Sequence, residues 1–207
     1  PEGLLVGSRG GLYTLPGAGG EPPFEPLPEE AESATVTRLA EEGGRLWAGT
    51  SAGLFRRRPE GGWERFEADP ELARSAIEAL HVDAAGSLWV ATTTHLARLR
   101  GGEVHEWVRE APVGLSVRAI AEDHEGNLWL GSQWAGLLRV RDGWTRRYSV
   151  PEGLHDPLVW SLARDADGRT WVGTNDGLAV FDGRRFTRVV PGAALPHANV
   201  YTLLPEA

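Results

Sequence analysis

The chain has 207 residues, of which 41% are hydrophobic and 24% charged, and its formal net charge at pH 7 is -8. This length and composition indicate one globular domain or one repeat array and exclude a disordered tail. The acidic balance argues against a nucleic-acid partner, because phosphate binding depends on clustered basic residues and all 21 basic side chains are arginines in short runs.

The sequence has no segment suited to direct membrane insertion. No window approaches the roughly eighteen apolar residues that cross a bilayer, and no charged-then-apolar leader is present. Because the sequence lacks methionine even at position 1, we expect a mature or excised portion of a longer product. The lack of cysteine excludes disulfide scaffolds, cysteine-based metal sites and cysteine nucleophiles, and leaves the compartment open.

A column of large apolar residues divides the chain into units of nearly constant length. Its members are Leu5, Trp47, Trp89, Trp129 and Trp171, at spacings of 42, 42, 40 and 42 residues. A period of this size is typical of one propeller blade.

Each unit contains the pattern of four short strands separated by glycine turns. In the fourth unit the strands are expected at residues 116–123, 128–132, 136–140 and 144–150. The sequence therefore predicts an all-β fold, a β-propeller of five four-stranded antiparallel blades, as a single domain. The blades are expected near residues 1–33 plus 198–207, 34–74, 75–114, 115–156 and 157–197.

The two ends of the chain are predicted to be able to share one blade. Residues 203–207 followed by residues 1–7 give LLPEAPEGLLVG, which overlays residues 162–173, LARDADGRTWVG, without a gap. Such a shared blade pairs strand edges that would otherwise stay open. The constant period is also compatible with a fragment of a larger ring, so both alternatives remain.

One segment conflicts with this periodicity. Residues 68–81 have an aspartate cap candidate, Pro70 and good helix formers, which together favour a helix. Alignment with the other units instead places residues 77–82 on an inner strand. We expect that strand, preceded by at most one helical turn, because the repeat outweighs local propensity.

The recurring tryptophan and glycine residues have structural explanations. A tryptophan at alternate strand positions fills the gap between neighbouring blades. The glycine two residues later, at Gly49, Gly131 and Gly173, leaves room for a side chain of the next sheet, and the glycine of the following turn is expected to have a positive φ.

Residues 165–178, DADGRTWVGTNDGL, closely resemble the two-component regulator propeller repeat, and the resemblance extends over all five units. It implies the ligand-sensing, usually periplasmic, propeller of a bacterial receptor whose remaining chain carries a kinase or cyclase output. The rings of this family usually have seven blades, and the better-known ligands are oligosaccharides or related small molecules. The family has no fixed binding motif, so the resemblance transfers no site residue.

Two neighbouring units depart from the ordinary glycine turn after the tryptophan strand. The third has Thr94 and His95 there, with His95 in the glycine column, and the fourth is one residue longer and has Gln133 and Trp134. An aromatic ring beside hydrogen-bonding groups suits sugar recognition, so these four residues are candidate ligand-binding residues. The simpler alternative is that Trp134 folds onto a neighbouring loop.

A second variable column follows the first apolar residue of each inner strand and comprises Thr37, Glu78, Arg118, Trp160 and Tyr201. At a channel mouth, Glu78 and Arg118 would be polar anchors of a ligand, and Trp160 and Tyr201 would be stacking surfaces. Packing between unequal blades explains the two aromatic residues equally well.

His155 and His197 occupy matching positions in two connections between blades and are further candidates. They lack the short spacing of a metal-ligand motif, so we expect neither a metal nor a cofactor. An enzyme related to glycosidases or to streptogramin-lyase propellers is the weakest alternative. The DADG turn is one residue out of register with a sialidase Asp-box, and no catalytic triad or carboxylate pair stands out. A non-catalytic ligand sensor and a protein-interaction platform remain.

Overall fold

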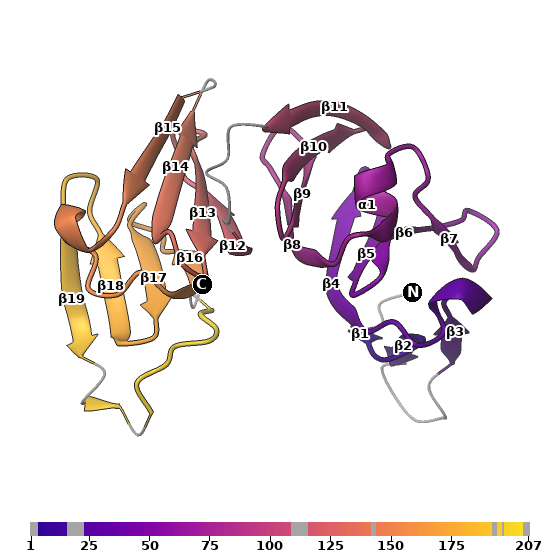
Figure 1. The fold of residues 1–207 in the computed structure, drawn as a ribbon, viewed down its shortest axis with the longest axis horizontal. Helices are drawn as coiled ribbons and strands as arrows, with labels where there is room; N and C mark the ends of the chain where they lie inside the picture. Colours follow the sequence, from indigo (N-terminus) through magenta and orange to yellow (C-terminus); the bar gives the residue numbers. More distant parts are fainter. Residues whose placement is uncertain are drawn as a thin grey trace. The chain divides into compact units, whose positions relative to one another are not determined.

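The computed structural model describes residues 4–15, 23–108, 116–141, 144–191, 194–195 and 197–204. Two compact parts make up the chain, Pro1–Arg109 and Glu110–Ala207. Antiparallel sheets with their strands in chain order form both parts, so the all-β prediction is confirmed (Figure 1).

The N-terminal part contains three sheets. Blade I consists of β1 (Leu4–Gly7), β2 (Gly11–Leu15) and β3 (Phe24–Pro26), followed by the 3-10 turn η1 (Glu29–Ala31). Blade II consists of β4 (Val36–Glu42), β5 (Arg45–Thr50), β6 (Gly53–Arg57) and β7 (Trp63–Arg65). Blade III consists of β8 (Ile77–Val82), β9 (Leu88–Thr92), β10 (Leu96–Arg100) and β11 (Glu103–Val108).

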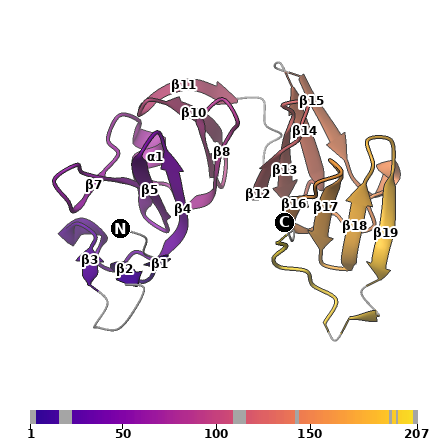
Figure 2. The same ribbon diagram turned by 180° about the vertical axis from the view of Figure 1, so that it is seen from behind.

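The C-terminal part contains two four-stranded sheets whose inner strands, β12 and β16, lie side by side (Figure 2). Blade IV consists of β12 (Val117–Glu122), β13 (Leu128–Ser132), β14 (Leu137–Arg141) and β15 (Trp144–Tyr148). After the 3-10 turn η2 (Val150–Glu152), blade V consists of β16 (Val159–Arg164), β17 (Thr170–Thr174), β18 (Gly177–Phe181) and β19 (Phe186–Pro191).

The segment that favoured a helix divides as the repeat predicted. A single short helix, α1 (Pro70–Arg74), is followed by the inner strand β8. The Asp69 side chain caps α1 by accepting hydrogen bonds from the backbone N–H groups of Glu71 and Leu72. Tertiary pairing with β9 ends the helix after one turn and keeps β8 extended.

Neighbouring blades interlock through the glycine column. A Cβ atom on Gly49 would lie 2.7 Å from Ile77 Cγ2, and one on Gly131 would lie 2.5 Å from Val159 Cγ1. Both distances are well inside van der Waals contact, so only glycine fits under the first residue of the next inner strand. The predicted close approach is confirmed in both parts.

In blades III, IV and V the tryptophan of the column is anchored by the aspartate that opens its turn. The indole N–H groups of Trp89, Trp129 and Trp171 donate to Asp83, Asp123 and Asp165 at 2.9, 2.8 and 2.7 Å. Partial desolvation would raise the pKa of Asp165, but the hydrogen bonds from Trp171 and Arg169 outweigh it and lower this pKa to about 2. The aspartates of this motif therefore have a structural role.

Blade I has three described strands, one fewer than predicted, and the segment at residues 197–204 forms no strand. This segment contacts blade V in the way that the first residue of an inner strand contacts the preceding blade. The Val200 N–H donates to Thr174 O at 3.0 Å, as the Val36 N–H donates to Ser8 O at 3.0 Å between blades I and II. The remaining residues of the predicted shared blade lie outside the described ones, so that blade stays a prediction.

Candidate functional site

A β-bulge displaces one inner-strand residue in every four-stranded blade. The register shifts directly after the first residue of β4, β8, β12 and β16. The displaced residues are Thr37, Glu78, Arg118 and Trp160. A bulge turns a side chain out of the alternation of its strand and is common beside binding sites. Four of the five residues in the variable column of the sequence are therefore bulge residues; Tyr201 lies in a segment that forms no strand.

Arg118 and Gln133 are brought together in the C-terminal part. Arg118 Nη2 donates to Gln133 Oε1 at 2.5 Å, and Ser116 Oγ donates to the same oxygen at 3.3 Å. Ser116 has a φ of 33° and is the one non-glycine residue with a positive φ in the described chain. Strained backbone concentrates at functional sites. Sequence reasoning missed Ser116, because only the backbone dihedral marks it.

Trp160 of β16 and Tyr201 of the C-terminal segment form a pair of contacting rings, here called the aromatic corner. Their ring centroids are 5.3 Å apart with an interplanar angle of 62°, and Asn199 Nδ2 donates to the Tyr201 hydroxyl at 2.6 Å. Tyr201 is 62% exposed, whereas the Trp160 Nε1 atom is buried and has no hydrogen-bond partner among the described residues. A buried donor without an acceptor is costly, so this N–H is an unsatisfied polar group of the aromatic corner.

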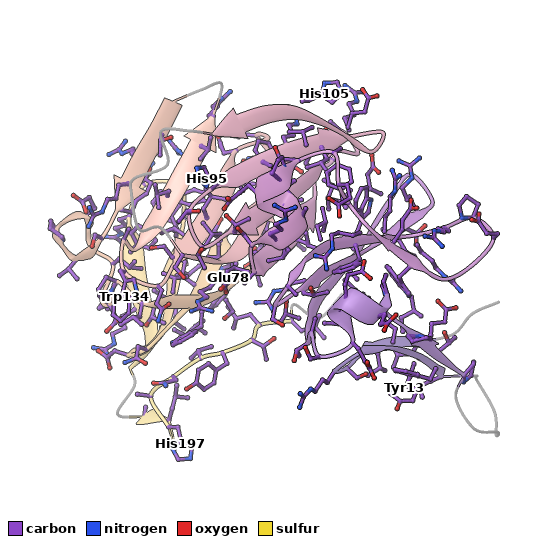
Figure 3. The ribbon with its side chains drawn as sticks, turned by 45° about the vertical axis from the view of Figure 1, so that its right-hand side comes forward. Tyr13, Glu78, His95, His105, Trp134 and His197 are labelled. Carbon is purple, nitrogen blue, oxygen red and sulfur yellow. The ribbon has the colours of Figure 1, made fainter. Side chains whose placement is uncertain are left out.

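Trp134 projects from the turn between β13 and β14 (Figure 3). Its side chain is 63% exposed, so it is not packed under a neighbouring loop. The turn itself is fixed: the Ser132 N–H donates to Gly136 O at 2.9 Å, and the Ala135 N–H donates to Ser132 Oγ at 2.7 Å. The inserted residue thus presents an aromatic ring on a well-defined turn.

In the N-terminal part, Thr94 and His95 gather around a residue that sequence reasoning missed, Glu71 of α1. Glu71 Oε1 accepts hydrogen bonds from Ser75 Oγ at 2.8 Å and Thr94 Oγ1 at 3.2 Å, and lies 3.5 Å from His95 Nδ1. The Ser75 hydrogen bond contributes most to a lowered Glu71 pKa; burial opposes it, and Thr94 and His95 lower it further. The signal that could have found it is the Pro-Glu pair at residues 70–71, which recurs at residues 151–152 in the matching connection before β16.

Glu78 lies in the same part, on the bulge of β8, and it also has polar or charged neighbours. The remaining bulge residue, Thr37, bridges two blades: its hydroxyl shares its one hydrogen between Ile77 O at 3.0 Å and Gly49 O at 3.2 Å. Thr37 therefore has a packing role, whereas Glu78 keeps an ionisable group on this face.

His155 and His197 are both exposed, and neither forms a hydrogen bond with a described residue. His197 lies at an outer bend of the C-terminal segment (Figure 3). Within the described chain, no group of three His, Cys, Asp or Glu side chains is arranged to hold a metal ion. Both histidines stay predictions as ligand-binding residues; His155 lies two residues before Pro157, whose carbonyl oxygen accepts a hydrogen bond from the Gly136 N–H of the turn that carries Trp134.

Residues 112–134 and 153–176 match the model of the two component regulator propeller family. These two segments carry the two-component regulator propeller repeat. Both matched segments belong to the C-terminal part, and they include Arg118, Gln133, Trp134 and Trp160. No curated protein sequence matches the chain significantly. Among the described residues, no helix has the length and apolar character that a membrane span requires.

Solved structures with the same fold include two extracellular domains from B. thetaiotaomicron. One is assigned to the hybrid two component system BT3049, with 17% identity and a TM-score of 0.79 over 95% of this chain and 28% of that one. The other is assigned to the one component system BT4673, with 18% identity and a TM-score of 0.73; the match covers 86% of the present chain and 26% of that domain. The present chain thus spans about a quarter of each.

Virginiamycin B lyase from Staphylococcus aureus is also similar, with 14% identity and a TM-score of 0.77 over 96% of this chain and 68% of the enzyme. Identities this low establish the propeller fold of the repeats and no shared activity. Function therefore has to be argued from the side chains of the loop face.

Proposed function

We propose that this chain is the ligand-sensing propeller of a bacterial signal-transduction receptor and that it binds a carbohydrate or another small molecule without chemical change. The binding face is formed by the bulge residues of blades IV and V, the turn between β13 and β14, and Tyr201. The observation that carries the proposal is the buried Trp160 Nε1–H, which has no acceptor among the described residues beside an exposed aromatic ring.

The side chains on this face supply the groups that a saccharide needs. Trp134 and Tyr201 are exposed aromatic surfaces on which the apolar face of a sugar ring stacks. Arg118 and the Gln133 amide offer donors and an acceptor to hydroxyl groups, and Trp160 adds a directed N–H. Few polar groups around aromatic surfaces are typical of small-molecule sites.

The N-terminal part supports a non-catalytic reading. Ser75, Glu71 and His95 are the residue types of a nucleophilic triad, but the carboxylate lies in the middle: both Ser75 Oγ and His95 Nδ1 contact Glu71 Oε1. Nucleophile activation requires the imidazole between the hydroxyl and the acid. The same cluster in the observed order fixes two loops and does not activate Ser75.

The family repeat supports the receptor context, in which the rest of a longer chain would carry a kinase or cyclase output and this propeller would lie outside the cytoplasm. A protein-interaction platform is the second candidate, because Trp134 would serve as an anchor in a protein interface as well. The sequence encoded beyond this chain distinguishes them: a membrane span followed by a kinase or cyclase domain supports the sensor.

The ligand proposal is tested by a thermal-shift screen of neutral mono- and oligosaccharides, followed by calorimetric titration of the best hit. Trp160→Phe keeps an aromatic ring and removes only the N–H, so we expect affinity to fall about three- to tenfold, the loss of one neutral hydrogen bond. Trp134→Ala removes a stacking surface and should weaken binding by a similar factor.

His124→Ala is the matched control, because His124 is exposed in the turn before β13, at the opposite end of that strand from Gln133 and Trp134. Its affinity should equal that of the parent chain. A saccharide that binds equally well to all three variants would show that the site lies elsewhere, and the absence of any hit in the screen would favour the interaction platform.

A further inference from the structure

A second face of blade II carries a cluster of arginines that the proposed sensor site does not use. A hollow of about 760 Å³ lies between the turn at residues 43–44 and the hairpin loop at residues 58–62. Its charged lining consists of Arg45, Arg56, Arg57 and Arg58 together with Glu60 and Glu64. Because β5 runs from this turn towards Ser51, the hollow lies at the opposite end of blade II from the turn that follows the tryptophan strand.

The arginines outnumber the carboxylates around this arginine hollow, although the whole chain is acidic. Glu64 is shared: it accepts from Arg56 Nε at 2.5 Å and from Arg58 Nε at 3.1 Å. Those two hydrogen bonds hold the pKa of Glu64 below its usual range, and the bond from Arg56 has the larger effect. Burial has a smaller, opposite effect on this pKa. One ionised carboxylate thus orients two guanidinium groups and neutralises only one of them.

Two further arginines have unused donors. No described residue forms a hydrogen bond or an ion pair with Arg45, whose guanidinium lies beside the backbone of Gly102. Arg57 pairs with Glu25 of β3 through Nη2, but its Nε atom is buried and has no hydrogen-bond partner among the described residues. Among the described residues, the guanidinium group of Arg45 therefore keeps its donors for a ligand in the hollow, whereas Arg57 Nε is buried.

We propose that the arginine hollow binds a ligand with two or more oxyanion groups, and specifically the sulfate or carboxylate groups of an acidic saccharide. Guanidinium donors form charge-assisted, often bidentate, hydrogen bonds with such groups. Arg56 and Arg57 are adjacent on β6, so they project to opposite faces of the blade, and one small anion cannot contact both sides.

An acidic saccharide fits this lining better than an acidic peptide does. Leu46 and Pro59 are the apolar side chains of the lining, so the hollow has no apolar pocket for a peptide side chain. The volume is within the range of small-molecule and cofactor sites, and the three lining glycines, Gly43, Gly44 and Gly61, have open space where a Cβ atom would be. Recognition here would come from charge and hydrogen bonds.

The test is a calorimetric titration of the chain with short dextran sulfate fragments and with neutral dextran of the same length. We expect the sulfated fragments to bind and the neutral ones not to bind. Arg45→Gln should reduce affinity about tenfold or more, as expected for one charge-assisted hydrogen bond, without loss of folding because no internal partner is left unpaired. Arg58→Gln should also weaken binding, while Glu64 keeps its contact with Arg56.

Arg184→Gln is the matched control, since it removes the same charge from an exposed turn of blade V. Equal affinities of Arg45→Gln and Arg184→Gln would overturn the proposal by showing non-specific attraction. Inorganic sulfate that saturates the site at the same concentration as the fragments would overturn the requirement for several oxyanions. A poly-glutamate peptide that binds as tightly as dextran sulfate would overturn the assignment to a saccharide.

Discussion

Gly131→Ala tests whether neighbouring blades interlock through the glycine column. The new Cβ atom would lie 2.5 Å from Val159 Cγ1, 3.2 Å from Val159 Cβ and 3.6 Å from Leu162 Cδ1. Val159 is fully buried, so it cannot move into solvent, and overpacking of this kind costs about 1–3 kcal/mol of unfolding free energy. Val159→Ala alone removes two methyl groups and leaves a cavity, at a cost of about 2–3 kcal/mol.

The double variant separates this contact from general damage to the core. Without the Cγ atoms of Val159, only the 3.2 Å contact remains, which a shift of a few tenths of an ångström relieves, and the added methyl group fills part of the cavity. We expect the double variant to be more stable than the sum of its parts by about 1–2 kcal/mol. Urea unfolding followed by tryptophan fluorescence measures each value.

Val36→Ala provides the control for this cycle, because Val36 is a buried first residue of an inner strand in the N-terminal part. Combined with Gly131→Ala, its loss of stability should be additive. Additive losses for Gly131→Ala and Val159→Ala as well would refute the interlock between blades IV and V.

Three further expectations concern the aspartate turns and the Glu71 cluster. Asp123→Ala leaves the buried indole N–H of Trp129 without an acceptor and should lower the unfolding free energy by about 1–3 kcal/mol, with the exposed Asp167→Ala as a near-neutral control in urea unfolding. The pKa of Asp165 is lowered to about 2 in the folded chain, so its contribution to stability is present above about pH 4 and is lost as the pH falls towards 2. Asp165→Asn should therefore reduce the change of the urea unfolding midpoint with pH over that interval. An unchanged pH dependence of the midpoint would contradict the lowered pKa. Ser75→Ala should raise the pKa of Glu71 in an NMR titration, because the hydrogen bond from Ser75 Oγ is the main cause of its lowered pKa, and an unchanged Glu71 pKa would count against that contact.

The regular part of the fold was predictable because its residues repeat for packing reasons. Gly131 and Trp129 recur because the next blade leaves space for one and requires the volume of the other, so one sequence carries several copies of the same constraint. Comparison of the units also predicted strand β8 where local propensity alone favours a helix. The helix is limited to residues 70–74, and β8 follows it. A single copy of that segment would have predicted the wrong element.

The candidate site was only partly predictable, because its geometry depends on features that occur once. Variation between units identified Arg118, Trp160 and Gln133, but the contact between Arg118 and Gln133 depends on the strained backbone of Ser116, which has no sequence signature. Glu71 was missed because its contacts with Thr94 and His95 join segments that are more than twenty residues apart in the sequence. The arginine hollow was missed because the run at residues 56–58 is ordinary as sequence and becomes a site only when two turns enclose it.

The bulge explains how variable residues coexist with a rigid repeat. The residue before it, Val159 in blade V, must fit against the glycine of the preceding blade, and the residues after it must resume the ladder with β17. The displaced residue is outside both of these constraints in blades IV and V, although in blade II the displaced Thr37 bridges to the next blade. Trp160 and Arg118 can therefore differ in size and charge without disturbing the contact that holds their blades together. A receptor built from such blades could change its ligand by substitution at these positions while its fold stays the same, which is why we place recognition there and stability one residue earlier.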